Sequence, residues 1–272
     1  MLGTDVGRAA EAAGLELIAY SRPELDVADS EAVALALRHS APAVVINCAA
    51  WTDVDRAEFD EERATIVNVA GAANVARAAA AIGAWTVHIS SDYVFDGSKR
   101  TPYLESDRPA PLSAYGRSKL AGERAVQRAA PSAHTIVRTS WLFGCGGRCF
   151  PRTIIRLARE RRALTVVEDQ IGCPTFTGHL ASALIELATE TRIAGMVHLA
   201  GGGECSWYEF ARALLDAAEL DANVNHGRAD DTERRAPRPA YSVLRSERLE
   251  VPEPPHWREG IKEFLGAGVA TQ

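Results

Sequence analysis

Residues 62–90, ERATIVNVAGAANVARAAAAIGAWTVHIS, hold the pattern that decides the fold. Their alanine-rich part, Glu62–Ile82, predicts a long helix, which Gly83 ends. The run that follows, Trp85–Ser90, is rich in aromatic and β-branched residues and predicts a strand. A helix that leads directly into such a strand is typical of a parallel sheet with helices on both faces.

The same alternation continues toward the N-terminus. The runs LELIAY at Leu15–Tyr20 and AVVINC at Ala43–Cys48 predict two further strands, with a helix between them from about Ser30 to His39. Asp29 or Ser30 can cap this helix, because a short side-chain oxygen accepts hydrogen bonds from free backbone N–H groups.

Toward the C-terminus, a helix is predicted from about Tyr115 to Ala129, and the strand His134–Ser140 follows it. Crossovers between parallel strands are right-handed, so this order of elements predicts a doubly wound, Rossmann-like α/β fold.

The pattern changes after about Gly144, and from Asp221 onward the chain is rich in proline and arginine. We expect a dinucleotide-binding domain at residues 1–145 plus about 171–204, with its first strand absent. A smaller, discontinuous α/β substrate lobe is expected at about 146–170 plus 205–272. The later elements are predicted as helices at Ile154–Arg162, Thr177–Glu190 and Trp207–Glu219 and strands at Thr165–Asp169 and Met196–Ala200.

The composition excludes several classes of protein. The chain has 272 residues, 47% hydrophobic and 24% charged, which is ordinary for a globular protein with a large core. Its net charge of −6 gives no support for nucleic acid as a partner. No apolar run is long enough to predict a membrane span, and the N-terminus lacks the pattern of a signal peptide.

The five cysteines are dispersed and form no CxxC pair. This pattern is typical of free thiols in a reducing cytoplasm, where we expect the protein to work. Cys145 and Cys149 stand four residues apart with no histidine near them, so we expect no zinc site and assign no metal ligands.

The first chemical signal is a YxxxK pair, Tyr115 and Lys119. Residues four apart share one face of a helix, so the phenol and the ammonium group can act together. The nearby positive charge should lower the pKa of the tyrosine toward working pH, which suits it to proton transfer. Chance copies of YxxxK are common, so the pair alone is a weak signal.

The segment SSDYVFDG at 90–97 strengthens that signal, because it directly follows the predicted strand Trp85–Ser90. Ligands bind at the carboxyl ends of the strands in open α/β sheets, which places Ser91 and Tyr93 beside a substrate. A hydroxyl there can polarise a carbonyl group. In the competing interpretation Ser90 and Ser91 are turn residues at a strand end, and Tyr115 is an aromatic residue that starts a helix.

These motifs together resemble the dTDP-4-dehydrorhamnose reductases of the extended short-chain dehydrogenase/reductase superfamily. SSDYVFDG is followed by PYLESDRPAPLSAYGRSKLAGE at 102–123, and the resemblance covers nearly the whole chain. Further matching segments are NCAAWTDVDRAE at 47–58, VNVAGAANVARAA at 67–79, DQIGCPT at 169–175, VHLAGGGECSWYEFAR at 197–212 and RPAYSVL at 238–244.

The resemblance implies a catalytic triad of Ser91, Tyr115 and Lys119, with Tyr115 as the proton donor. Many members have threonine at the first position, and serine also offers the hydroxyl. The residues implied in cofactor binding are Gly3, Asp26, Val27, Cys48, Ala49, Ala50, Tyr115 and Lys119. Those implied near the substrate are Thr52, Ser91, Asp92, Tyr93, Trp141 and Arg238.

The implied reaction transfers a hydride from NADPH or NADH to C4 of dTDP-4-dehydro-L-rhamnose and yields dTDP-L-rhamnose. Arg22 could accept a 2′-phosphate or could simply lie solvated in a turn, so the choice of cofactor stays open. Two alternatives also stay open: another dTDP-4-keto-6-deoxysugar reductase, and a non-catalytic relative such as a methionine adenosyltransferase regulatory subunit. Members can form homodimers, in some cases with Mg²⁺ at the interface.

The arginine-rich stretch with Arg234, Arg235 and Arg238 has two interpretations. Guanidinium groups grip phosphates with paired hydrogen bonds, so the stretch could clamp the diphosphate of a nucleotide sugar. It could equally be a solvated loop. Because RPAYSVL resembles the family segment, we expect at least one of these arginines near the ligand, whereas Trp207 and Tyr208 are expected to pack the lobe.

The start of the chain, MLGTDV, departs from the family pattern. It resembles only the end of the GxxGxxG motif, with Gly3 as its last glycine, and the strand before that motif is absent. Loss of a central strand would leave two unpaired strand edges. We therefore expect the chain as written to be unstable or to bind cofactor poorly.

Overall fold

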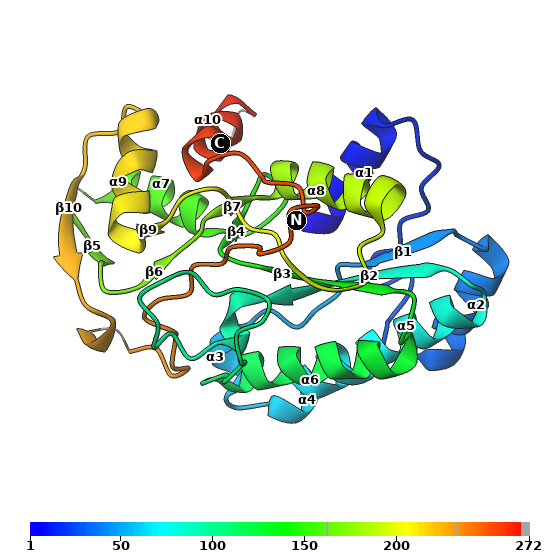
Figure 1. Ribbon diagram of the computed structural model, residues 1–272. Coiled ribbons are helices and arrows are strands. Elements are labelled where there is room, and N and C mark those ends of the chain that lie inside the picture. The colour runs from blue at the N-terminus through cyan, green and yellow to red at the C-terminus, as the bar shows by residue number, and fades with distance from the viewer. Residues whose placement is uncertain (162, 232, 268–272) are drawn as a thin grey trace.

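The computed structural model describes residues 1–161, 163–231 and 233–267 (Figure 1). Its centre is a parallel sheet of four strands in the order β1-β2-β3-β8. These strands span Val44–Asn47, Trp85–Ser91, His134–Thr139 and Gly195–His198. The predicted α/β class with a parallel sheet is therefore confirmed.

Helices cover both faces of this sheet, as the doubly wound arrangement requires. On one face, α1 (Leu2–Ala12) packs against α8 (Thr177–Glu186), and their apolar side chains meet those of β2, β3 and β8. On the other face lie α5 (Ala72–Ala81) and α6 (Ala114–Ala129), with α2 (Ser30–Ser40) beside α5 (Figure 1).

The predicted helix at 62–82 is built from three segments. These are α4 (Glu61–Thr65), a π-helical turn over Ile66–Gly71, and α5, and Gly83 follows with a φ of +74°. The cap of α2 is Asp29, whose carboxylate accepts hydrogen bonds from the N–H groups of Glu31 and Ala32. Alanine content and capping chemistry therefore located the helices, but not the π turn.

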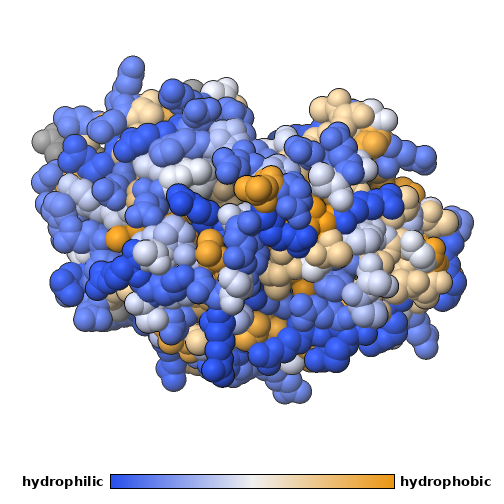
Figure 2. Space-filling model, in the orientation of Figure 1, coloured by the Kyte–Doolittle hydropathy of each residue, from blue (hydrophilic) through white to orange (hydrophobic). Residues whose placement is uncertain are grey.

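The predicted strand Leu15–Tyr20 is wrong. The segment pairs with no described strand, and four of its apolar side chains are between 38% and 55% exposed. In Figure 2, apolar atoms gather on the side of the molecule that carries α1 and the segment after it. The apolar run has strand composition, but a strand also needs a hydrogen-bonded neighbour, and β1 pairs with β2 and with no other described strand.

The second half of the chain adds a smaller α/β layer. Strand β5 (Ala163–Val167) pairs in parallel with β10 (Asn223–Gly227), and α7 (Phe150–Glu160) and α9 (Trp207–Ala217) contact them. Helix α10 (Trp257–Gly266) packs on the same core. Neither β10 nor α10 was predicted, because the proline- and arginine-rich tail has little periodicity.

Short elements link the two parts of the molecule. Strand β4 pairs with β7 and β6 pairs with β9, so the chain passes between the layers several times (Figure 1). The remaining described elements are β4 (Leu142–Phe143), β6 (Ile171–Gly172), β7 (Thr175–Phe176), β9 (Cys205–Ser206), α3 (Val54–Ala57), a second π turn (Leu187–Thr191) and the 3-10 turns Asp92–Val94 and Ala229–Asp231.

Candidate active site

The candidate site is formed where β2 ends and α6 begins. Ser91 is the last residue of β2, and its hydroxyl accepts a hydrogen bond from the N–H of Tyr93 at 3.2 Å. Ser113 caps α6 by accepting a hydrogen bond from the N–H of Gly116 at 3.1 Å, which places Tyr115 in the first turn. Gly116 is required here, because a Cβ would lie 2.2 Å from the carbonyl oxygen of Tyr93.

The structure brings the three predicted triad residues to this corner. The side chain of Ser91 acts to lower the pKa of the Tyr115 hydroxyl, and both residues are buried. Lys119 lies one helical turn after Tyr115, and its Nζ donates a hydrogen bond to the carbonyl oxygen of Ile89 in β2 at 2.7 Å. The strand end and the first turns of the next helix thus hold all three residues, and their catalytic role stays a prediction.

The pKa of Tyr115 differs in direction from the sequence-based expectation. Burial raises it above the ordinary value, and the side chain of Ser91 opposes this only in part. Burial also lowers the pKa of Lys119 to about 8, so the positive charge beside the tyrosine is itself reduced. The expectation of a lowered tyrosine pKa is therefore wrong for the structure as it stands, because desolvation outweighs the opposing effect of the Ser91 side chain.

Asp92 is held inside the site and faces other protein groups. One carboxylate oxygen accepts from Ser91 at 3.0 Å and the other accepts from Ser242 at 2.7 Å. Burial raises the pKa of this carboxyl group to about 6, and both hydrogen bonds oppose the rise. Asp92 therefore anchors the tail segment near Ser242 to the end of β2.

Tyr93 connects the triad to the arginine-rich tail. Its ring meets that of Tyr115 edge-on, with 5.5 Å between the ring centroids. The charge of Arg238 acts to lower the pKa of the Tyr93 hydroxyl, and the guanidinium group of Arg238 forms a 2.7 Å ion pair with Asp55. Burial raises the pKa of Tyr93 to about 12. Arg238 therefore lies close enough to Tyr93 to act on its hydroxyl, and its place near the ligand stays a prediction.

The other two residues predicted near the substrate are placed differently. Trp141 has a φ of +47°, unusual for a residue with a side chain, and its ring stacks on Trp207 at 3.5 Å. Thr52 is exposed, in the segment between β1 and α3. Trp207 thus packs within the lobe as expected and also touches a predicted site residue.

The residues predicted to bind a dinucleotide follow the carboxyl end of β1. The N–H of Ala49 donates to the side chain of Asn47 at 3.1 Å, which shapes the turn at Cys48–Ala50. A Cβ on Gly3 would lie 3.8 Å from that of Cys48, so α1 begins directly above this turn.

Two further observations concern the other residues predicted to bind the dinucleotide. The N-terminus of α1 has no side-chain cap, so its free N–H groups suit the pyrophosphate of the cofactor. Val27, next to Asp26, accepts a hydrogen bond from Asn74 and packs against Gly71. Arg22, weighed as a 2′-phosphate ligand, is largely exposed and lies 3.8 Å from Asp26.

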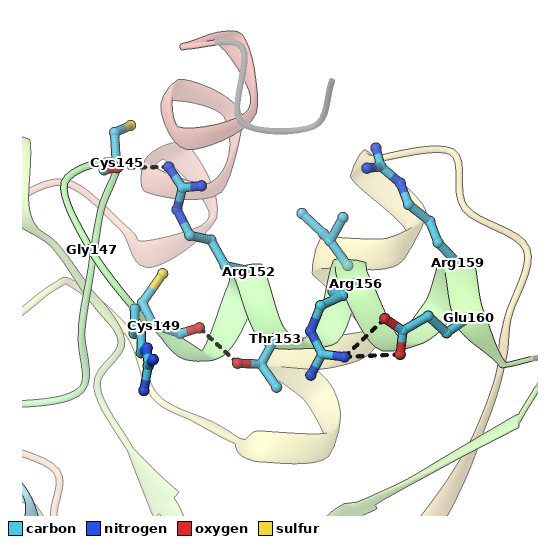
Figure 3. A pocket seen from close by; sticks show the side chains of 10 residues that line it. Cys145, Gly147, Cys149, Arg152, Thr153, Arg156, Arg159 and Glu160 are labelled. Atoms are coloured by element: carbon cyan, nitrogen blue, oxygen red, sulfur yellow. Dashed lines mark hydrogen bonds and ion pairs between the residues drawn. The ribbon is translucent and has the colours of Figure 1, made fainter. Parts of the chain in front are cut away.

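A large hollow lies elsewhere, along α7 (Figure 3). Its volume is about 1070 Å³, and none of the triad residues lines it. Its walls carry Arg148, Arg152, Arg156 and Arg159, of which Arg156 pairs with Glu160. No cluster of metal-ligating side chains and no helix able to cross a membrane occurs in the described ranges 1–161, 163–231 and 233–267.

The profile of one protein family, the RmlD substrate binding domain, matches residues 1–269. The chain belongs to the RmlD substrate binding domain family. Relatives of this RmlD-family chain include reductases and a polysaccharide biosynthesis protein. The dTDP-4-dehydrorhamnose reductase of Mycolicibacterium smegmatis is 41% identical over 277 residues, covering 100% of this chain and 84% of that protein. A spore coat polysaccharide biosynthesis protein of Bacillus subtilis is 40% identical, covering 97% and 93%.

A solved structure shares the architecture of this RmlD-family chain. The dTDP-4-dehydrorhamnose reductase of Bacillus anthracis, crystallised in complex with NADP, has a TM-score of 0.94 at 36% sequence identity. The match covers 98% of this chain and 95% of that one. The family resemblance and the Rossmann-like fold predicted from the motifs are therefore confirmed.

One residue of the RmlD-family site escaped the sequence analysis. Asn68 lies in the π turn, almost fully buried, and accepts a hydrogen bond from the N–H of Trp51 at 2.8 Å. Its amide also donates to the hydroxyl of Ser118 at 2.9 Å, so it joins the turn after β1 to α6. An amide side chain in an alanine-rich helix was the signal that could have revealed it.

Proposed function

We propose that the chain reduces the C4 keto group of dTDP-4-dehydro-L-rhamnose with NADPH or NADH, giving dTDP-L-rhamnose. The observation that carries the proposal is the burial of Ser91 at the end of β2 and of Tyr115 in the first turn of α6, with Lys119 one helical turn away. The family and its reductase relatives supply the substrate class. The NADP-bound relative supports the choice of cofactor.

Two tasks are assigned to the residues of this chain: to stabilise the negative charge that develops on the substrate oxygen, and to donate a proton to it. When bound, the nicotinamide supplies the hydride for C4. The hydroxyl of Ser91, which donates to Asp92 in this structure, turns to donate a hydrogen bond to the substrate carbonyl oxygen, and this bond stabilises the negative charge that grows there. Tyr115 gives its proton to that oxygen, and Lys119, charged below a pH of about 8, favours the phenolate that remains.

The raised pKa of Tyr115 suits the direction of this reaction. A protonated phenol is the form that donates, and burial keeps the hydroxyl protonated at neutral pH. Substrate and cofactor bring new charges and hydrogen bonds to the pocket, and these act on the phenolate when the proton leaves.

Binding of the two ligands is assigned to the two sides of β2. Asp26, Val27, Cys48–Ala50 and the N-terminus of α1 at Gly3 would hold the dinucleotide, with Lys119 on its ribose. Thr52, Ser91, Asp92, Tyr93, Trp141 and Arg238 are proposed to surround the sugar nucleotide. Arg238 is proposed to bind the diphosphate, since a guanidinium group binds phosphate oxygens in pairs.

The domain limits given above are also proposed for the folded chain, with residues 1–145 and 171–204 forming one unit. Separate apolar clusters support the division, one around β2, β3 and α8 and another around α7, α9 and α10. A cytoplasmic location and assembly into homodimers are proposed on the family resemblance.

The test is an absorbance assay of nicotinamide oxidation with dTDP-4-dehydro-L-rhamnose, using the wild type and Tyr115→Phe. The substitution removes the proton donor and should lower kcat by about 10²–10⁴-fold. Tyr208→Phe, a tyrosine in the lobe, is the matched control and should keep wild-type kcat. Equal activity of Tyr115→Phe and wild type contradicts the assignment, and an inactive wild type that binds the dinucleotide points to a different keto sugar or to a regulatory role.

A further inference from the structure

A fully buried ion pair lies next to the triad, and the proposed mechanism does not use it. Glu123 is 2% exposed and Arg138 is 3% exposed. Nε and one terminal nitrogen of Arg138 donate to the two carboxylate oxygens at 2.8 and 2.7 Å. Removing two charges from water costs several kcal/mol, and an apolar pair of similar size is often at least as stable. A role besides stability is therefore worth seeking.

The pair is tied to both elements that carry the triad. Ser90 donates a hydrogen bond to Glu123 at 2.6 Å, and Ser90 immediately precedes Ser91 in β2. In the sheet, Ser90 of β2 lies opposite Arg138 of β3. Glu123 follows Lys119 by four residues in α6, so the two share one face of the helix. The carboxylate of Glu123 thus joins the end of β2, next to Ser91, to the helix that carries Lys119.

Glu123 also affects the protonation of Lys119, because its negative charge favours the ammonium form. Cys48 after β1 and His88 in β2 also act on Lys119, but both are neutral near pH 7. Burial raises the pKa of the Cys48 thiol to about 12, and burial with the lysine charge lowers that of His88 well below its usual range. Glu123 is left as the carboxylate that opposes the effect of burial on Lys119.

We infer that Glu123, held in place by Ser90 and Arg138, is a positioning residue that keeps Lys119 protonated and in register with Ser91 during reduction. The inference rests on the proposed function for its catalytic meaning, but the charge state of Lys119 can be measured without any activity. Arg138 orients the carboxylate, and its other terminal nitrogen lies 3.5 Å from Nε2 of His198 in β8. Two further residues thus support the triad: Glu123, one turn after Lys119 in α6, and Arg138 in β3.

The direct test is a titration of Lys119 by NMR. The chain has three lysines, Lys99, Lys119 and Lys262, so selective ¹³C labelling gives few signals, and Lys119→Arg identifies the one required. Glu123→Gln keeps the size of the side chain and removes its charge. We expect the titration midpoint of Lys119 to fall by about one pH unit. Glu61→Gln, which breaks the exposed pair between Glu61 and Arg117 of α6, is the control and should leave the midpoint unchanged.

The second readout is the pH dependence of kcat/KM. If the proposed function is right, the alkaline limb of the profile should move to lower pH by the same amount in Glu123→Gln, and a role in stability alone would not move it. An inactive wild type overturns the proposed function and leaves the titration as the test of Glu123. An unchanged midpoint in a folded variant overturns the inference.

A further variant is needed in case Glu123→Gln does not fold. Glu123→Gln leaves Arg138 unpaired in the core, so the double variant Glu123→Leu/Arg138→Leu removes both charges together. It should lower the midpoint of Lys119 as the single variant does. If neither protein folds, Ser90→Ala decides, since it removes one hydroxyl from the carboxylate. A several-fold fall in kcat with unchanged KM supports positioning, and wild-type kcat overturns it.

Discussion

The sheet is longer and better buried on the β3 side of strand β2 than on the β1 side. Toward β3, the registered pairs run from Thr86 to Ser91, and every β2 residue in that range is buried. On the other side, β1 is four residues long, three of them only partly buried, and it ends the described sheet. The segment Leu15–Tyr20 pairs with no described strand, and four of its apolar side chains are between 38% and 55% exposed. The proton-transfer groups therefore stand on a closed scaffold, whereas the proposed cofactor edge is open.

This contrast separates two requirements of a reductase. The triad needs fixed positions, because proton transfer depends on short and directed hydrogen bonds. The dinucleotide edge is made of backbone turns and a helix N-terminus, which can be completed by the ligand itself. A ligand that binds the folded form alone stabilises it in proportion to its concentration. We therefore expect cofactor to matter for folding as well as for chemistry.

The sharpest test of the contrast compares two isoleucines. Ile136 in β3 is fully buried, whereas Ile18 is 55% exposed in the open segment. Ile136→Ala should cost about 2–5 kcal/mol of unfolding free energy, because it leaves a cavity in the core. Ile18→Ala should change it by less than about 0.5 kcal/mol. Urea unfolding of both variants measures this, and equal losses would show that the edge is as well packed as the centre.

The closed side should also show its own pH dependence. Asp92 is 1% exposed, and its pKa is raised to about 6 in the folded chain. A raised acid pKa means that the folded state prefers the protonated form, so this contribution is fully present below about pH 4. It is lost as pH rises through about 6, at a cost of about 2–3 kcal/mol. In Asp92→Asn, the free energy of unfolding should therefore fall less between pH 4 and pH 7 than it does in the wild type. Unfolding curves at several pH values measure this, and an equal fall in both proteins would contradict the assignment.

The open side should respond most to cofactor. NADPH at about one hundred times its Kd should stabilise the chain by about 2.7 kcal/mol if it binds the folded form alone. In hydrogen exchange, the amides of Val44–Asn47 and of the first turn of α1 should gain protection, and those of β3 should change least. Equal gains at β1 and β3 would mean that the two sides unfold as one unit.

A smaller effect is expected at the helix that borders the open side. Asp29→Ala removes the cap of α2 and should cost about 1 kcal/mol. Asp29→Asn retains a capping oxygen and should restore most of this loss, as thermal unfolding would show. Failure of asparagine to restore it would mean that the carboxylate acts through its charge.

The contrast also explains what the sequence could predict. Helix α6 and strands β2 and β3 were predicted to within a few residues, because capping, spacing and apolar composition all agree there. The triad followed from the same segments, since a strand end and the start of the next helix meet at one edge of the sheet. Local pattern and global fold point to the same answer in this region.

The failures share a physical cause, which is dependence on a distant partner. Leu15–Tyr20 has the composition of a strand, but pairing decides whether a strand forms. The pKa of Tyr115 depends on burial by the rest of the molecule, and the spacing of two residues carries no information about it. Strand β10 exists because β5 lies beside it, although the tail alone shows little periodicity.

The π turn at Ile66–Gly71 is equivalent to a single-residue insertion that a helix has absorbed. Each residue of an α-helix advances the chain by about 100° around the axis. Deleting one residue from this turn would let α4 and α5 merge into one regular helix, but it would rotate α4 by that angle relative to α5. Asn68 would then leave Trp51 and Ser118, and the loop after β1 would lose its attachment to α6. The deletion would make the helix more regular, but it would also separate the proposed cofactor turn after β1 from α6, the helix that carries Tyr115 and Lys119.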